Sequence, residues 1–156
     1  MSQIRPAQSG DGPRLQQLQT ALTEPSPTLL SAALAEQLRA ERESAAPPSV
    51  RTFTLIVTVN DNNTAVGYLL AIPGEKTHIA ELVVAAEYRR EGRARALLDW
   101  LSDTTDRPLT VHVAADNDPA RTLYGERRFT ERTRSADLFE CGVGLTLQYD
   151  PQQTSH

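Results

Sequence analysis

Apolar and polar residues alternate with a period of two along several stretches of this chain, which is the pattern of half-buried β-strands. Residues 53–59 and 66–72 both show it, and the turn residues at 60–63 between them predict a hairpin. A third strand is expected at 77–84, after a Pro-Gly turn. Further strands are expected at 4–7, at 109–113, from Phe129 onward and at 143–149.

Other stretches carry apolar residues every three or four positions, which predicts helices. The first carries Leu15, Leu18 and Leu22 on one face and must end at the Glu24–Pro27 segment, because proline interrupts a helix. Further helices are expected at about 28–43, from 93 to near 104, and from 117 through 124. This order of elements predicts an α/β (α+β) fold. We expect one domain over residues 1–150 and a disordered tail at 151–156.

Composition narrows the class of protein. A chain of 156 residues is long enough to bury a core, and Cys141, the only cysteine, excludes an intrachain disulfide and a cysteine-rich zinc site. The net charge of −4 argues against a general nucleic-acid-binding protein. No signal peptide and no apolar run long enough to cross a bilayer are apparent, so we expect a cytoplasmic protein without a membrane partner.

A basic turn, Arg89-Arg90-Glu91-Gly92-Arg93-Ala94, connects the strand at 77–84 to the helix that follows. The first four N–H groups of a helix have no acceptor inside it, and the helix dipole favours negative charge there. The glycine lets an anion approach closely, and the arginines attract it from a distance. The turn therefore fits a phosphate-binding loop. On these residues alone, a solvated basic helix start with a turn glycine fits equally well.

The motif Arg89-x-x-Gly92-x-Ala94, preceded by Leu82-x-Val84 and Tyr88, resembles the acetyl-CoA signature of the GCN5-related N-acetyltransferases (GNAT). A second motif, Asn117-x-x-Ala120-x-x-Leu123-Tyr124 followed by Phe129, stands at the distance expected in that family. The resemblance covers nearly the whole chain. It implies the GNAT fold, a mixed, mostly antiparallel central sheet of six to seven strands with about four flanking helices.

One residue departs from the family pattern in a way that affects the backbone. Arg128 stands where the family usually has glycine before the aromatic residue. If this position needs a left-handed backbone, a non-glycine residue costs on the order of 1 kcal/mol there. A different turn is the alternative.

The resemblance implies that acetyl-CoA (CoA) binds along this strand and turn. Main-chain N–H groups of the turn would hold the pyrophosphate, and the strand backbone would pair with the pantetheine arm. The Val84 N–H would polarise the thioester carbonyl. Arg127 is a candidate for the 3′-phosphate, and no metal site is expected. The residues expected at the cofactor are Leu82, Val83, Val84, Arg89, Arg90, Glu91, Gly92, Arg93, Ala94, Arg95, Asn117, Ala120 and Tyr124.

The resemblance places Tyr124 beside the leaving thiolate. A tyrosine pKa of about 10 against about 8.5 for a thiol makes full proton transfer uphill by roughly 2 kcal/mol, so a hydrogen bond is the expected role. The attacking amine must be neutral, which makes a base useful. His112, on the polar face of its strand, is the first candidate, Glu81 the second and His78 the third. Each also has a structural alternative, and a bulge in the strand at 77–84 would change the face on which Glu81 lies.

The implied activity is direct transfer of an acetyl group to a primary amine of a small molecule or a peptide. A catalytically silent CoA-binding sensor or scaffold of the same fold is the alternative, and transfer of a longer acyl group is a third hypothesis. The acceptor site is implied to lie among the first two helices and the loop at 134–141, which carry no motif for the acceptor. A homodimer is plausible from the family, and no nucleic-acid partner is expected.

Overall fold

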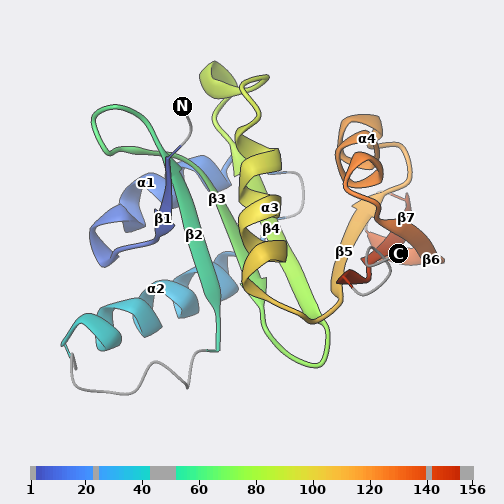
Figure 1. The fold of residues 1–156 in the computed structure, drawn as a ribbon, viewed down its shortest axis with the longest axis horizontal. Helices are drawn as coiled ribbons and strands as arrows, with labels where there is room; N and C mark the ends of the chain where they lie inside the picture. Colours follow the sequence, from blue (N-terminus) through green and yellow to red (C-terminus); the bar gives the residue numbers. More distant parts are fainter. Residues whose placement is uncertain (1–2, 23–24, 43–51, 140–141, 152–156) are drawn as a thin grey trace.

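A computed structural model describes residues 3–22, 25–42, 52–139 and 142–151 (Figure 1). The predicted loop at 45–49, Cys141 and residues 152–156 of the predicted tail lie outside these ranges. The strands are β1 (Gln3–Pro6), β2 (Thr54–Val59), β3 (Ala65–Ile72), β4 (Thr77–Val84), β5 (Leu109–Ala114), β6 (Thr130–Phe139) and β7 (Gly142–Tyr149). The helices are α1 (Gly12–Gln19), α2 (Pro27–Arg42), α3 (Arg93–Thr104) and α4 (Asp118–Glu126), with short 3₁₀ turns η1 (Ser9–Asp11) and η2 (Ala86–Tyr88).

The strands of the described chain form one sheet of seven, in the order β1-β2-β3-β4-β5-β7-β6. Only β4 and β5 run parallel, and every other neighbouring pair is antiparallel. This confirms the predicted mixed, mostly antiparallel sheet with four flanking helices. No helix among the described residues is both long and apolar enough to cross a membrane.

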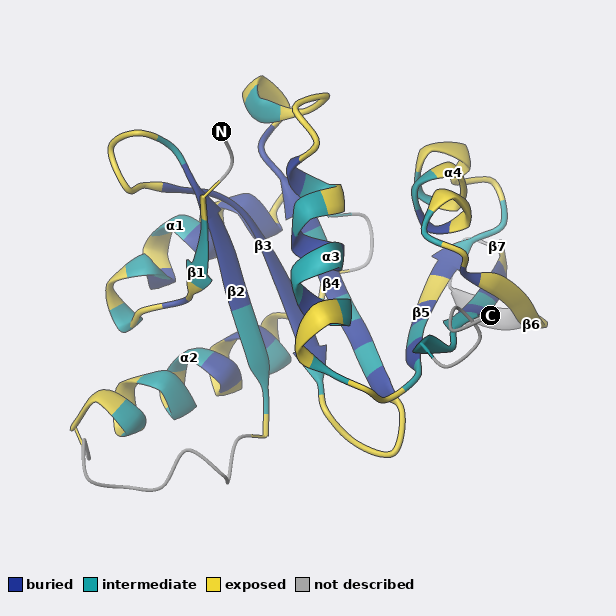
Figure 2. Ribbon diagram, viewed as in Figure 1, coloured by how far each residue is buried: buried dark blue, intermediate teal, exposed yellow. Residues whose placement is uncertain are grey.

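The two faces of the sheet carry separate apolar cores. On one face, Leu15 of α1 and Leu30 of α2 pack against Tyr68 of β3. On the other face, Leu97 of α3 and Tyr124 of α4 share a core with inward side chains of β5 and β7. Helices α1 and α2 thus cover one side of the sheet and α3 the other (Figure 1). β3 is buried along nearly its whole length, whereas the first half of β6, at the sheet edge, is exposed (Figure 2).

β4 and β5 part soon after they meet. Their register joins Thr77 to Leu109, His78 to Thr110 and Ile79 to Val111. Within the described strands the pairing stops there, although β4 continues to Val84 and β5 to Ala114 (Figure 1). β5 stays paired to β7 over its whole length, so it is the β4 edge that loses its neighbour.

A bulge at Ala80 changes the phase of β4. Leu70 of β3 pairs with Glu81, but the next residue, Ala71, pairs with Ile79, so Ala80 is the extra residue. Without the bulge, Glu81 would share a face with Ile79. With it, Glu81 lies on the side of α1 and α2, while Ile79 and Leu82 pack on the side of α3.

The first helix is shorter than its apolar repeat predicts. It ends at Gln19, and the Leu22 N–H donates to the Gln19 carbonyl in a tighter turn. The Thr20 hydroxyl donates to the Gln17 carbonyl at 2.7 Å and so satisfies one of the last acceptors of the helix. Leu22 still packs against the core from outside the helix.

Arg128 has a left-handed backbone, with φ of 70°. The Arg128 N–H donates to the Gly125 carbonyl and the Phe129 N–H to the Tyr124 carbonyl. These two bonds form a Schellman motif, in which the residue after the cap is usually glycine because it must be left-handed. The turn at the end of α4 therefore keeps the geometry that the glycine serves, with an arginine in its place.

We expect Arg128→Gly to raise the free energy of unfolding by about 0.5–1 kcal/mol, because it removes left-handed strain that exceeds the added chain entropy of glycine. Urea denaturation measures the change. Arg128→Ala keeps Cβ and removes the charge, so it should leave stability near the starting value. Equal stabilisation by both substitutions would assign the effect to charge and contradict the strain.

Candidate active site

The basic turn after β4 presents free N–H groups at the start of α3. Gly92 has φ of 77° and Arg90 has φ of 65°, so two left-handed residues turn the chain into the helix. The Ala96 N–H donates to the Gly92 carbonyl at 2.9 Å. The N–H groups of residues 93–95 precede this bond and have no acceptor inside the helix. A Cβ added at Gly92 would meet no atom within 4 Å, so the space in front of the turn is open.

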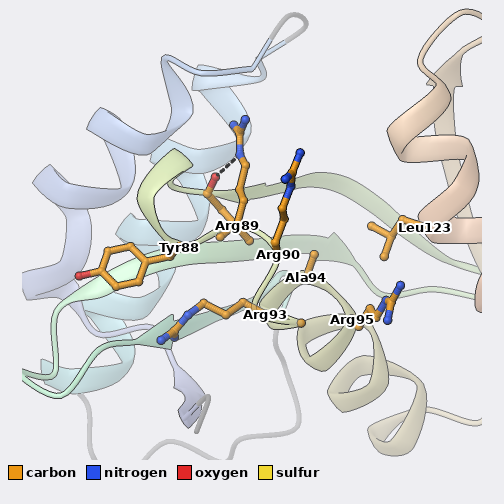
Figure 3. Close-up of a pocket in the computed structure, with 9 residues that line it drawn as sticks. Tyr88, Arg89, Arg90, Arg93, Ala94, Arg95 and Leu123 are labelled. Atoms are coloured by element: carbon orange, nitrogen blue, oxygen red, sulfur yellow. Dashed lines mark hydrogen bonds between the residues drawn. The ribbon is translucent and has the colours of Figure 1, made fainter.

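A cavity of about 400 Å³ lies over this turn. Its walls come from the end of β4, the turn, the first turn of α3 and one residue of α4, Leu123 (Figure 3). The predicted cofactor residues that line it are Val84, Arg89, Arg90, Gly92, Arg93, Ala94 and Arg95. The cavity therefore collects most of the basic motif in one place.

The arginines of the turn do different things. Arg90 is exposed, and its side chain extends from the turn beside that of Arg89 (Figure 3). Arg89 donates from Nε to the Val84 carbonyl at 3.1 Å. Arg95 pairs with Glu126 at 2.6 Å and so links α3 to α4. Of these side chains, Arg90 is the one best placed to reach a ligand.

Arg93 turns its side chain inward, beneath the turn. Its guanidinium donates to the Thr58 hydroxyl at 2.8 Å, to the Val59 carbonyl at 3.0 Å and to Glu91 at 2.9 Å. It also lies over the Tyr88 ring, 5.2 Å from the centroid. The side chain thus fastens the turn to β2, and only its main-chain N–H is left for an anion.

The free edge of β4 points N–H groups towards the gap left by β5. The Ala85 N–H donates to the Val66 carbonyl at 2.8 Å, on the β3 side. Successive N–H groups of an extended strand point to opposite edges, so the Val84 N–H points away from β3. Leu82 and Val83 pack their side chains into the cores on either face. The Leu82 main chain faces the gap as that of Val84 does, whereas the Val83 main chain faces β3.

The second motif shapes α4. The Asn117 side chain accepts from the Ala120 N–H at 3.2 Å and caps the helix, as predicted. Tyr124 is buried beneath the helix, with its ring edge-on to Phe129 at a centroid distance of 5.1 Å. Burial raises the pKa of Tyr124 well above its ordinary value, so its hydroxyl stays protonated at neutral pH. Tyr124 does not line the basic cavity, whereas its neighbour Leu123 does.

His112 and His78 lie together where β4 and β5 part. Their ring centroids are 4.6 Å apart, and His112 is exposed to solvent. Each Nδ1 lies 3.0 Å from a threonine hydroxyl, Thr110 for His78 and Thr146 for His112. Partial burial lowers the pKa of both histidines, and for His78 the nearby His112 adds to the effect. Thr146 escaped sequence reasoning because its only signal is a polar position on β7.

Glu81, the second candidate base, is buried on the side of α1 and α2. Its carboxylate accepts hydrogen bonds from Gln19, from the Ser26 main chain and from Tyr68.

Arg127, the candidate for the 3′-phosphate, pairs with Asp99 of α3 at 3.0 Å. It lines a second cavity, of about 380 Å³, and not the cavity over the basic turn. Within the described residues, no group of three or more His, Cys, Asp or Glu side chains is placed to hold a metal ion.

The parted strands and the open helix start together fit a ligand that carries a diphosphate and lies along a strand edge. The chain belongs to the acetyltransferase (GNAT) family, whose model matches residues 15–129. A search of curated proteins finds no match in sequence.

Solved structures share the fold over nearly the whole chain, at low sequence identity. NAA60 of Arabidopsis thaliana, in complex with a bisubstrate analogue, is 18% identical with a TM-score of 0.76, and the match covers 96% of this chain and 97% of that chain. The ribosomal-protein-S18-alanine N-acetyltransferase of Escherichia coli is 17% identical with a TM-score of 0.71, over 95% and 92%. A chimera of the spermidine N-acetyltransferase SpeG from Vibrio cholerae and hSSAT is 18% identical with a TM-score of 0.73, over 97% and 96%.

We expect Gly92→Asn to weaken binding of CoA by about tenfold or more, because its side chain enters the open space in front of the turn. Asparagine tolerates a positive φ, so the free energy of unfolding should fall by no more than about 1 kcal/mol. Calorimetric titration and urea denaturation measure the two effects. Gly10→Asn, also in open space but in η1, serves as the control and should bind CoA normally. Unchanged affinity in folded Gly92→Asn would contradict the binding role of the turn.

Substitutions of Arg90 and Arg93 should have different effects, the first on CoA binding and the second on stability. We expect Arg90→Ala to weaken CoA binding several-fold, most at low salt, and to change the free energy of unfolding by less than about 0.5 kcal/mol. Arg93→Ala should lower the free energy of unfolding by about 2–3 kcal/mol, because it leaves buried acceptors on β2 unsatisfied. Titration at two salt concentrations and denaturation curves test the pair. The reverse assignment would show that Arg93 reaches the ligand.

Proposed function

We propose that this protein is an acetyl-CoA-dependent N-acetyltransferase that transfers an acetyl group directly to a primary amine of a small molecule or a peptide. The observation that carries the proposal is the free β4 edge that ends at an open, basic helix start. Membership of the GNAT family supports it. Among the structures of the same fold, NAA60 and a phosphinothricin acetyltransferase hold acetyl-CoA.

The residues present fit the coenzyme. The open space at Gly92 and the N–H groups of residues 93–95 suit a pyrophosphate, and Arg90 adds positive charge beside them. The unpaired β4 edge suits the amide-containing arm, which hydrogen-bonds as an added strand would. When bound, acetyl-CoA supplies the acetyl group as a thioester. Every other part of the chemistry falls to residues of the chain.

The Val84 N–H and the Tyr124 hydroxyl are the groups that we assign to the thioester. The N–H points into the gap and would polarise the carbonyl oxygen as a small oxyanion hole. The raised pKa of Tyr124 keeps its hydroxyl a donor, which suits a hydrogen bond to the leaving thiolate better than complete proton transfer. Asn117 and Ala120 act on the site through α4, by capping and packing the helix that carries Tyr124.

His112 is the base that we assign to the amine. Deprotonating a lysine-like amine at pH 7 costs roughly 4.6 kcal/mol, against about 1 for an α-amine, so a base nearby is useful. His112 is open to solvent at the gap, and its lowered pKa keeps it neutral and able to accept a proton at pH 7. The Thr146 hydroxyl fixes Nδ1, which leaves Nε2 for the amine or an intervening water. His78, whose tilted ring lies 4.6 Å from that of His112 between centroids, is the reserve candidate.

Two of the proteins that share this fold are named for acceptors of different kinds. One acetylates the alanine of ribosomal protein S18, and another acetylates spermidine. Both kinds carry a primary amine, and we propose that the acceptor of this chain belongs to one of these two classes, a peptide or a small molecule.

Turnover separates an enzyme from a silent CoA-binding module of the same fold. Release of free thiol from acetyl-CoA with an amine panel supports the enzyme, and tight CoA binding without release on any amine supports the module.

We expect kcat/KM to rise with pH through an apparent pKa below about 6.5 and then to level off, because the base must be neutral and the pKa of His112 is lowered. His112→Ala should lower kcat by about 10²–10⁴-fold and abolish this rise. Thiol release across pH 5–9 measures both. Thr146→Val, which frees Nδ1, should lower kcat less while keeping the rise. An unchanged pH profile in His112→Ala would move the role to another group.

A further inference from the structure

Glu81 is a buried carboxylate that the proposed chemistry does not use. It is 3% exposed, and its two oxygens accept four hydrogen bonds. Oε1 accepts from Gln19 at 3.0 Å and from the Tyr68 hydroxyl at 2.8 Å. Oε2 accepts from Gln19 at 2.9 Å and from the Ser26 N–H at 2.6 Å.

The donors come from both ends of one connection. Gln19 is the last residue of α1, and Ser26 directly precedes Pro27, the first residue of α2. The Leu30 N–H donates back to the Ser26 carbonyl, so Ser26 belongs to the start of that helix. A single side chain of β4 therefore holds the end of α1 and the beginning of α2. The third donor, Tyr68, ties the same carboxylate to β3.

In the described part of the chain, hydrogen-bond donors, and no cation, surround the Glu81 carboxylate. No arginine, lysine or histidine among the described residues forms an ion pair with it. Its place at the start of the 16-residue helix α2 gives it the positive end of a helix dipole, and hydrogen bonds to a charged acceptor are stronger than neutral ones. A buried carboxylate that lost these donors would be costly, so the carboxylate and the connection hold each other in place.

The position of Glu81 along β4 places these hydrogen bonds beside the gap between β4 and β5. The bulge at Ala80 turns Glu81 towards α1 and α2 just beyond Ile79, the last β4 residue paired with β5. The connection is thereby anchored to the strand beside the gap in which the reaction is proposed to occur. A base there would need a lone pair directed at the amine, but both oxygens of Glu81 are already engaged by protein donors.

We propose that Glu81 is a positioning residue, which ties the end of α1 at Gln19 and the start of α2 at Ser26 to β4 beside the acceptor site and takes no part in proton transfer. The inference rests on the proposed function, because that function places the amine at His112, which alternation puts on the same side of the sheet as Glu81. Under this proposal Glu81 affects the affinity for the amine, which KM reports, whereas His112 affects the rate, which kcat reports.

The test is Glu81→Gln, which keeps the shape of the side chain but replaces one acceptor oxygen with an NH₂ group. The probes are a lysine-free tetrapeptide with a free N-terminus and spermidine, with thiol release from acetyl-CoA as the readout. We expect KM for the amine to rise about tenfold, kcat to change less than about threefold, and the acid limb of the pH profile to stay in place. Tyr68→Phe removes one donor and keeps the carboxylate, so it should shift KM in the same direction but less.

Amide exchange followed by NMR tests the same proposal without an acceptor. The Ser26 N–H should be protected in the starting protein and should exchange at least about tenfold faster in Glu81→Gln, while amides of α3 stay unchanged. If Glu81→Gln does not fold, Tyr68→Phe carries both measurements.

Two results would overturn the proposal. One is a loss of kcat of about 100-fold or more with KM unchanged and the acid limb abolished, which would make Glu81 the base. The other is equal exchange at Ser26 in both proteins. Calorimetry with CoA keeps the two ideas apart, because a starting protein that does not bind CoA refutes the proposed function and leaves the exchange result standing.

Discussion

The parting of β4 and β5 is the constraint on which the site depends. A parallel pair in the middle of a sheet normally shares hydrogen bonds along its length, yet here three residue pairs are joined and the remaining edge of β4 is left open. Buried main-chain groups need partners, so an open edge inside a fold is a place for a ligand that can act as a strand.

The basic turn at the end of that edge is held in place by the Arg93 side chain beneath it. The Arg93 guanidinium contacts β2, Glu91 and the Tyr88 ring. These contacts order the turn, whose N–H groups face outward. A turn that is already ordered loses little conformational entropy when it binds. Arg90, which has no such structural contact in the described residues, leaves its charge at the surface for long-range attraction.

The sequence predicts the fold well because most of its signals are local. Alternation along β2 and β3, the Asn117 cap and the glycine in the basic turn each specify a conformation from a few neighbouring residues. The site is less predictable because its contacts are distant in the chain. The inward turn of Arg93 depends on Thr58, and the setting of Glu81 depends on Gln19 and Ser26. The left-handed Arg128 was foreseeable only from the family's glycine, since nothing in its neighbours marks it.

The extra residue at Ala80 sets a rule for how this protein can change over evolution. Side chains of a strand alternate between faces, so regular pairing of β4 without the bulge, at unchanged chain length, would exchange the faces of everything beyond Ala80. The carboxylate would then enter the apolar layer beneath α3, and Leu82 would meet the polar donors of Gln19 and Ser26. Deletion of Ala80 itself would keep Glu81 and Leu82 on their present faces, whereas any other single insertion or deletion in β4 would have to be absorbed by a change in the bulge.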